Sequence, residues 1–93
     1  MDNLDQLRRQ IDALDEQLVA LLNQRATSAL AIGRLKEAAG LPVYQPTREA
    51  DVLAHVRGHN TGPLDAAAIT RLFERIIDEA RRLERQAAGT GTD

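Results

Sequence analysis

The sequence predicts an all-α fold with three helices per chain, a very long first helix and an intertwined helical homodimer. A seven-residue apolar repeat runs from Leu4 to Leu35 without a proline, which is typical of a helix packed along a seam. Glycine and proline break the pattern at 40–42 and 58–63, which leaves three helical segments. A chain of 93 residues has a marginal core as a monomer, and this favours an oligomer.

The first helix is expected from about Asn3 to about Ala39, because Gly40 and then Pro42 end it. About 36 residues at 1.5 Å per residue span roughly 54 Å, more than two short helices of the same chain can cover. The far half therefore needs a second copy against which to bury its seam. The seam consists of Leu4, Leu7, Ile11, Leu14, Leu18, Leu21, Ile32 and Leu35.

The second helix is expected over about 48–57, with Thr47 as its N-cap. Val52, Leu53 and Val56 are spaced to face inward from it. The break at 58–63 then separates this helix from the last one.

The third helix is expected to begin after Asp65, a good N-cap residue, and to continue to about residue 86. Residues 1–86 would then form one helical domain. The remainder, 87–93, is expected to be a disordered tail or the stub of a linker. The apolar stripe of this helix consists of Ile69, Leu72, Phe73, Ile76, Ile77, Ala80 and Leu83.

One charged residue interrupts the seam of the first helix. Arg25 falls between Leu18 and Ile32 in one apolar series, and Ser28 interrupts the other. An arginine does not lose its charge, so its burial is costly unless an anion meets it. The anion is either a ligand inside the bundle or the carboxylate of a structural ion pair.

Lys36 lies on the same side of the first helix as Arg25, because 11 residues are close to three whole turns, and Arg8, 17 residues before Arg25, flanks the same apolar seam. Arg25 and Lys36 are about 16 Å apart along the axis and bracket the space of a small molecule. Arg8 is about 25 Å further away, but in an antiparallel dimer it enters the site of the other chain. Alternatively, Arg8 and Lys36 are solvated flank charges.

Glu84 lies on the inner edge of the third helix, 4, 7 and 11 residues after members of the apolar stripe. It is a structural partner for Arg25, an acid of the site, or a residue of a helix end that frays into water. Arg48 and Glu49 open the second helix and either hold an anion there or complement the helix dipole. The charged residues that read as solvated faces are Asp12, Asp15, Arg81, Arg82 and Arg85.

Composition excludes several classes of function. The net charge of −2, with one Phe, one Tyr and no Trp, argues against a nucleic-acid partner. Without cysteine there is neither a disulfide nor a thiolate metal site, and His55 and His59 read as exposed side chains, so no metal is expected. No signal peptide or membrane span is visible, so no membrane partner and a cytoplasmic location are expected.

An ordered set of segments resembles the all-helical class of chorismate mutases. The set covers about residues 4–86 and consists of LRRQIDALDEQLVALLNQR, IGRLK, VYQPTREADVL, NTGPLD and ITRLFERIIDEARRLE. The resemblance implies an intertwined homodimer with two equivalent sites. It also implies the unimolecular rearrangement of chorismate to prephenate, on the route to phenylalanine and tyrosine, with no cofactor and no metal.

Carried over by position, the resemblance implies roles for four residues around the reacting bond. Arg25 and Arg8 of the partner subunit would hold the two carboxylates of the dianionic substrate. Lys36 would hydrogen-bond the ether oxygen of the breaking bond from one side and Glu84 from the other. Glu84 stands where some members of the family have glutamine.

Further residues would hold the ring. Glu49 would accept a hydrogen bond from the ring hydroxyl, and Arg48 would support the carboxylate end. Gln45 departs from the family pattern because relatives often carry an aspartate there, near the hydroxyl. Ala80 departs as well, because some relatives carry a serine that touches a carboxylate. Both departures concern affinity rather than the existence of the activity.

Two alternatives remain open. One is an isochorismate-pyruvate lyase on the same fold, although the intact VYQPTRE segment and Glu84 look more like the mutase. The other is a helical dimerisation or regulatory module without activity. Arg25 argues against such a module, because pure assembly gains little from a buried charge.

Overall fold

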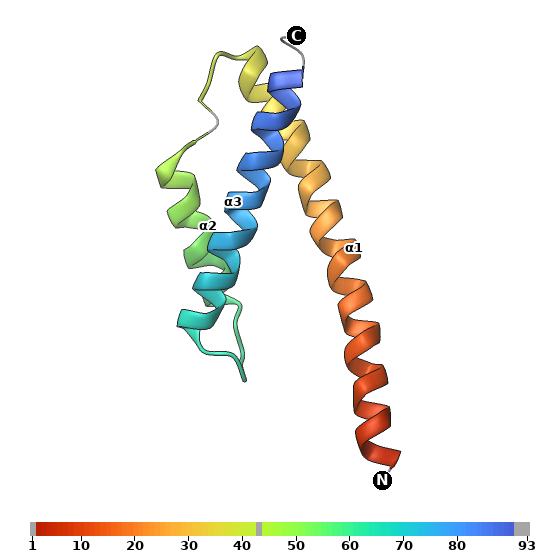
Figure 1. The fold of residues 1–93 in the computed structure, drawn as a ribbon. Helices are drawn as coiled ribbons and strands as arrows, with labels where there is room; N and C mark the ends of the chain where they lie inside the picture. Colours follow the sequence, from red (N-terminus) through yellow and green to blue (C-terminus); the bar gives the residue numbers. More distant parts are fainter. Residues whose placement is uncertain (1, 43, 91–93) are drawn as a thin grey trace.

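The chain forms three helices and no strand over residues 2–42 and 44–90, the part described by a computed structural model. The helices are α1 (Asp2–Ala38), α2 (Pro46–Gly58) and α3 (Ala66–Thr90), as Figure 1 shows. The all-α prediction and the very long first helix are confirmed. None of the helices in these ranges is long and apolar enough to cross a membrane.

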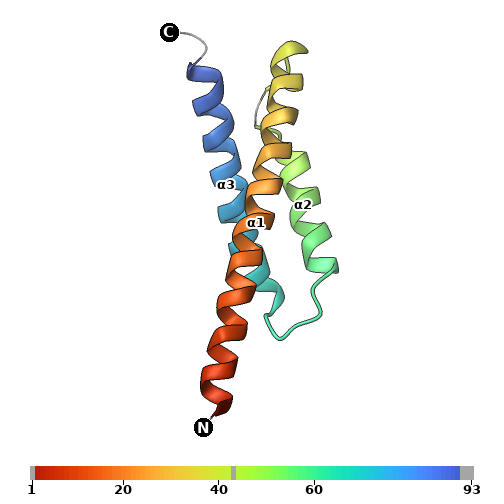
Figure 2. The ribbon, with the colours of Figure 1, turned by 90° about the vertical axis from the view of Figure 1, so that its right-hand side faces the viewer.

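α3 holds the chain together because it packs against both α1 and α2. The N-terminal half of α1 extends beyond the other two helices in both views (Figures 1 and 2), and the molecule measures 57 × 29 × 15 Å. The prediction that one chain cannot cover its own first helix is confirmed. The six seam residues of this half are between 54% and 59% exposed: Leu4, Leu7, Ile11, Leu14, Leu18 and Leu21.

The isolated chain has almost no core. Ile77 is the one buried apolar residue among those described, and Leu72, expected in the apolar stripe of α3, is exposed. The chain presents 7351 Å² to solvent. A compact monomer of this mass exposes only about 5300 Å² by the usual scaling of area with size, so roughly 2000 Å² is left uncovered.

α2 begins earlier than expected. The predicted N-cap, Thr47, is wrong: Pro46 is the first helical residue, and Gln45 is the N-cap with extended backbone angles and no side-chain cap. Proline suits this position because its φ is already helical and its missing N–H would have no partner there. The backbone N–H of Glu49 donates to the carbonyl of Gln45 at 3.2 Å.

α3 begins as predicted but ends later. Asp65 is its N-cap, since its Oδ1 accepts a hydrogen bond from the backbone N–H of Ala68 at 2.8 Å. The helix continues to Thr90, so residues 87–90 are not the disordered tail that the sequence predicted. Ala87 and Ala88 favour helix, and one glycine near a helix end costs little. The rest of the predicted tail, 91–93, lies outside the described residues.

Candidate active site

A cavity of about 390 Å³ lies where α1, α2 and α3 meet. Its size is within the usual range for a site that binds a small molecule. It is lined by Arg25, Ser28, Ala29, Ile32, Lys36, Gln45, Arg48, Glu49, Val52, Ile77, Ala80, Arg81 and Glu84.

α1 contributes the two cations that the sequence placed on one face. Arg25 and Lys36 are three helical turns apart, so both side chains reach the same cavity. Ser28 and Ala29 lie between them, and their small side chains leave space for a ligand. The interruptions of the apolar seam at Arg25 and Ser28 therefore coincide with the cavity wall.

Arg25 is half-buried, yet no ion pair between described residues includes it. The alternative in which Glu84 pairs with Arg25 is therefore not found in the described part of the chain. A half-buried guanidinium without a carboxylate favours a bound anion, because desolvation of the charge is otherwise uncompensated.

The start of α2 and the residue before it bring three more predicted residues to the cavity. Gln45 and Glu49 are half-buried, whereas Arg48 is exposed at the rim. These side chains meet α1 only through tertiary packing, since the sequence places them on a separate helix.

α3 places Ala80 and Glu84 on the far wall. The Oε2 atom of Glu84 is shielded from solvent and has no hydrogen-bond partner among the described residues. A buried polar atom of this kind costs about 1–3 kcal/mol unless a ligand or a proton satisfies it. Glu84 therefore has the features of an acid of the site, and the fraying alternative does not hold.

Gly33 explains how Glu84 comes so close to α1. A Cβ atom at position 33 would lie 3.2 Å from Cγ of Glu84 and 3.3 Å from its Oε2. That separation is closer than most carbon contacts, so a larger residue would press on the carboxyl group. The sequence signal was a glycine in the interior of a long helix, where it is otherwise unfavourable.

Arg81 was predicted on a solvated face, and that prediction is wrong. Its side chain is only 27% exposed and lines the cavity. Its Nη2 lies 2.6 Å from Asp78 Oδ1 and 3.2 Å from Glu49 Oε1. The spacing held a signal, because position 81 follows Ile77 by four residues and precedes Glu84 by three, so all three share one face.

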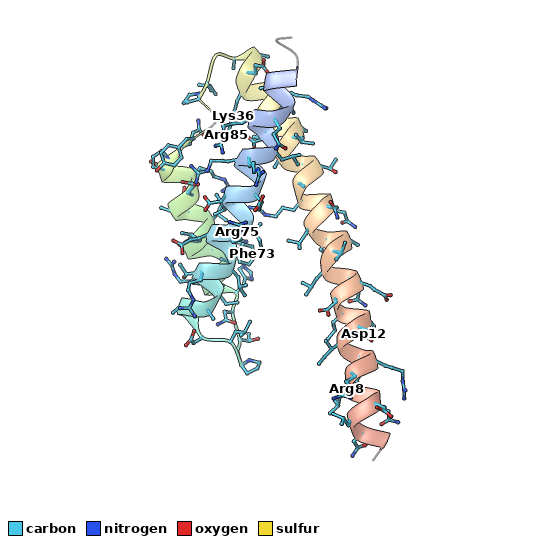
Figure 3. The ribbon with its side chains drawn as sticks, in the orientation of Figure 1. Arg8, Asp12, Lys36, Phe73, Arg75 and Arg85 are labelled. Atoms are coloured by element: carbon cyan, nitrogen blue, oxygen red, sulfur yellow. The ribbon has the colours of Figure 1, made fainter. Side chains whose placement is uncertain are left out.

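Arg8 is not among the residues that line the cavity. Figure 3 shows it on the projecting half of α1, far from Lys36. A second cavity, of about 580 Å³ between α1 and α3, adjoins the first at Arg25 and Ala80. Arg25 thus lines both cavities.

No metal site is formed within the described residues. They contain no group of three or more His, Asp or Glu side chains that could hold an ion. His55 and His59 have ring centroids 4.5 Å apart, and both are exposed.

Comparison with known families agrees with this geometry. The model of the family described as chorismate mutase type II matches residues 7–85. The chain belongs to this family. The resemblance inferred from the ordered segments is therefore confirmed, and the family is one of isomerases.

Curated relatives are longer than this chain. A bifunctional chorismate mutase/prephenate dehydratase of Pseudomonas aeruginosa is 41% identical over 88 residues, which cover 89% of this chain and 24% of the relative. The T-protein of Enterobacter agglomerans is 36% identical over 90 residues, 97% of this chain and 22% of the relative. The chain thus spans about a quarter of the length of these relatives.

Solved structures match along nearly their whole length. A chorismate mutase from Thermus thermophilus has a TM-score of 0.87 and 34% identity, covering 89% of this chain and 94% of that one. The chorismate mutase from Helicobacter pylori in complex with prephenate has a TM-score of 0.87 and 29% identity, covering 96% and 97%.

Proposed function

We propose that this chain catalyses the rearrangement of chorismate to prephenate. The observation that carries the proposal is the cavity wall of Arg25, Lys36 and Glu84, in which Arg25 has no ion-pair partner among the described residues. A dianionic substrate explains cations around a cavity in a protein of net charge −2. Membership of the family supports the same substrate.

The reaction breaks one C–O bond and forms one C–C bond within a single molecule, so it needs no nucleophile, metal or cofactor. The site then has two tasks. It holds the flexible enolpyruvyl arm over the ring in a reactive conformation. It also stabilises the negative charge that develops on the ether oxygen as the C–O bond breaks.

Each helix that lines the cavity contributes residues with a proposed role. Lys36 on α1 and Glu84 on α3 approach the ether oxygen from opposite sides, and Arg25 binds one carboxylate. On the α2 side, Arg48 supports a carboxylate and Glu49 accepts a hydrogen bond from the ring hydroxyl. Gln45 lies near that hydroxyl, and Ala80 contributes shape but no hydrogen bond.

Glu84 has to be protonated when it acts. An ionised carboxylate accepts hydrogen bonds but donates none, and it would repel the developing oxyanion. The buried Oε2 atom, which has no hydrogen-bond partner among the described residues, supports this role. When the carboxyl group is protonated, its O–H can donate a hydrogen bond to the substrate.

The functional unit proposed here is a homodimer with shared sites. The roughly 2000 Å² that one chain leaves uncovered is of the size of an obligate interface. Arg8 of the partner subunit would complete the cation set, because Arg8 of the same chain lies on the projecting half of α1, far from the cavity. The cytoplasmic location expected from the sequence stays a prediction.

The decisive experiment follows the loss of chorismate absorbance with purified protein and identifies the product. We expect conversion to prephenate, abolished in Arg25→Ala. Isochorismate is tested in parallel, and cleavage of isochorismate without turnover of chorismate would establish the lyase instead. Turnover of neither, in a folded dimer whose melting temperature chorismate does not change, would establish a non-catalytic module.

A further inference from the structure

Arg81 joins three parts of the chain at the edge of the cavity. From α3, its guanidinium reaches Glu49 on α2 and lies 4.8 Å over the ring of Tyr44 in the linker between α1 and α2. It also contacts Asp78 on its own helix. Among the ion pairs between residues that the structure describes, the pair of Arg81 with Glu49 is the one that connects two helices.

The two ion pairs of Arg81 differ in surroundings. The side chain of Glu49 is 23% exposed, whereas that of Asp78 is 57% exposed. The pair with Asp78 is a local contact on one helix, a class that contributes little in water. The pair with Glu49 is more shielded and crosses between helices, so it restrains where the Glu49 carboxylate lies.

The position of the Glu49 carboxylate matters because cations line the same cavity. Arg25, Lys36 and Arg48 line the same cavity. A Glu49 carboxylate released from Arg81 would turn toward one of them and compete with the carboxylates of a dianionic ligand. With its Oε1 against Arg81, the other oxygen of Glu49 stays available as an acceptor.

We propose that Arg81 is a positioning residue that holds Glu49 as the acceptor for the ring hydroxyl of the substrate and keeps it from neutralising the cations of the cavity. The inference rests on the proposed function. Arg81 acts through Glu49, while stacking on Tyr44 keeps the linker against α3.

The first test compares the kinetics of Arg81→Ala and Asp78→Asn with those of the wild type. The ring hydroxyl takes no part in the bonds that break and form, so Arg81→Ala should raise KM with little change in kcat. The expected rise is about tenfold, the loss of roughly one hydrogen bond to a charged group. Arg81→Lys keeps the charge and should recover part of the affinity. Asp78→Asn removes the exposed partner only and should change KM less than about twofold.

The second test is a double-mutant cycle with Glu49→Ala. If Arg81 acts through Glu49, adding Arg81→Ala to Glu49→Ala should change KM by less than about twofold. Circular dichroism at the assay temperature shows that each variant is folded. Additive losses in the cycle, or equal losses in Asp78→Asn and Arg81→Ala, overturn this inference while leaving the mutase activity in place. A folded wild type that does not convert chorismate overturns the proposed function and this inference together.

Discussion

The two halves of α1 carry the same apolar repeat but lie in different surroundings. In the N-terminal half every described residue up to Gln24 is exposed. In the C-terminal half, from Arg25 to Lys36, the helix packs against α3 and lines the cavity. An uninterrupted seam thus marks the half that one chain cannot cover, and a seam broken by Arg25 and Ser28 marks the half that forms a site.

The largest effect is expected from a substitution in the N-terminal half of α1. Leu14→Glu places a charge on the uncovered seam, and we expect it to abolish the proposed dimer at micromolar concentration. Two symmetry-related substitutions each remove about 1.5–3 kcal/mol of burial and add the cost of desolvating a carboxylate. Ala13→Glu, one residue away on the outer face, should leave the dimer intact.

The measurement for Leu14→Glu is light scattering together with helicity. For the wild type, the unfolding midpoint should rise with protein concentration, because dimerisation stabilises the folded state by mass action. A monomeric wild type with full helicity would show that the exposed seam is not an interface.

In the C-terminal half, Lys36→Met should preserve the fold and lose most of the rate. In the proposed mechanism Lys36 acts mainly in the transition state, so the loss should appear in kcat rather than in KM. One charge-assisted hydrogen bond in a closed site is worth on the order of 3 kcal/mol. Arg34→Met, an exposed neighbour, serves as control. A loss of less than about tenfold would show that Lys36 is only a flank charge.

A complementation experiment tests whether the two halves of α1 form one site across the proposed dimer. Arg8→Ala and Arg25→Ala should each be nearly inactive. Mixing them with exchange of subunits gives heterodimers in which one site has both arginines, so up to half of the wild-type activity per heterodimer should return. Persistent inactivity of a verified heterodimer would place Arg8 outside the site.

The smallest effect is expected for Glu84→Gln, on the wall opposite α1. The amide keeps a hydrogen-bond donor where the proposed mechanism places one at the ether oxygen, so kcat should change by less than about threefold. Glu84→Ala removes the donor and should lower kcat more than about tenfold. Glu74→Gln, an exposed change on the same helix, should reproduce the wild-type rate. A kcat of Glu84→Ala equal to that of the wild type would show that Glu84 does not contact that oxygen.

Local sequence patterns were enough to predict the helices and the placement of side chains along each of them. The seven-residue repeat and the breaks at 40–42 and 58–63 were enough for three helices, and Asp65 marked the start of the last one, because caps and periodicity act within a few residues. The placement of Arg25 and Lys36 on one wall also followed from helical geometry alone, since a rigid helix sets the angle between its own side chains.

Tertiary structure decided what lies opposite that wall. Arg81 reads as a surface arginine until α2 and the linker pack beside α3 and bring Glu49 and Tyr44 within its reach. The close approach of Glu84 to Gly33 likewise depends on how closely α1 and α3 pack. The physical reason is the same in both cases: periodicity orients a side chain about its own helix axis, whereas the partner it meets depends on packing between helices distant in sequence.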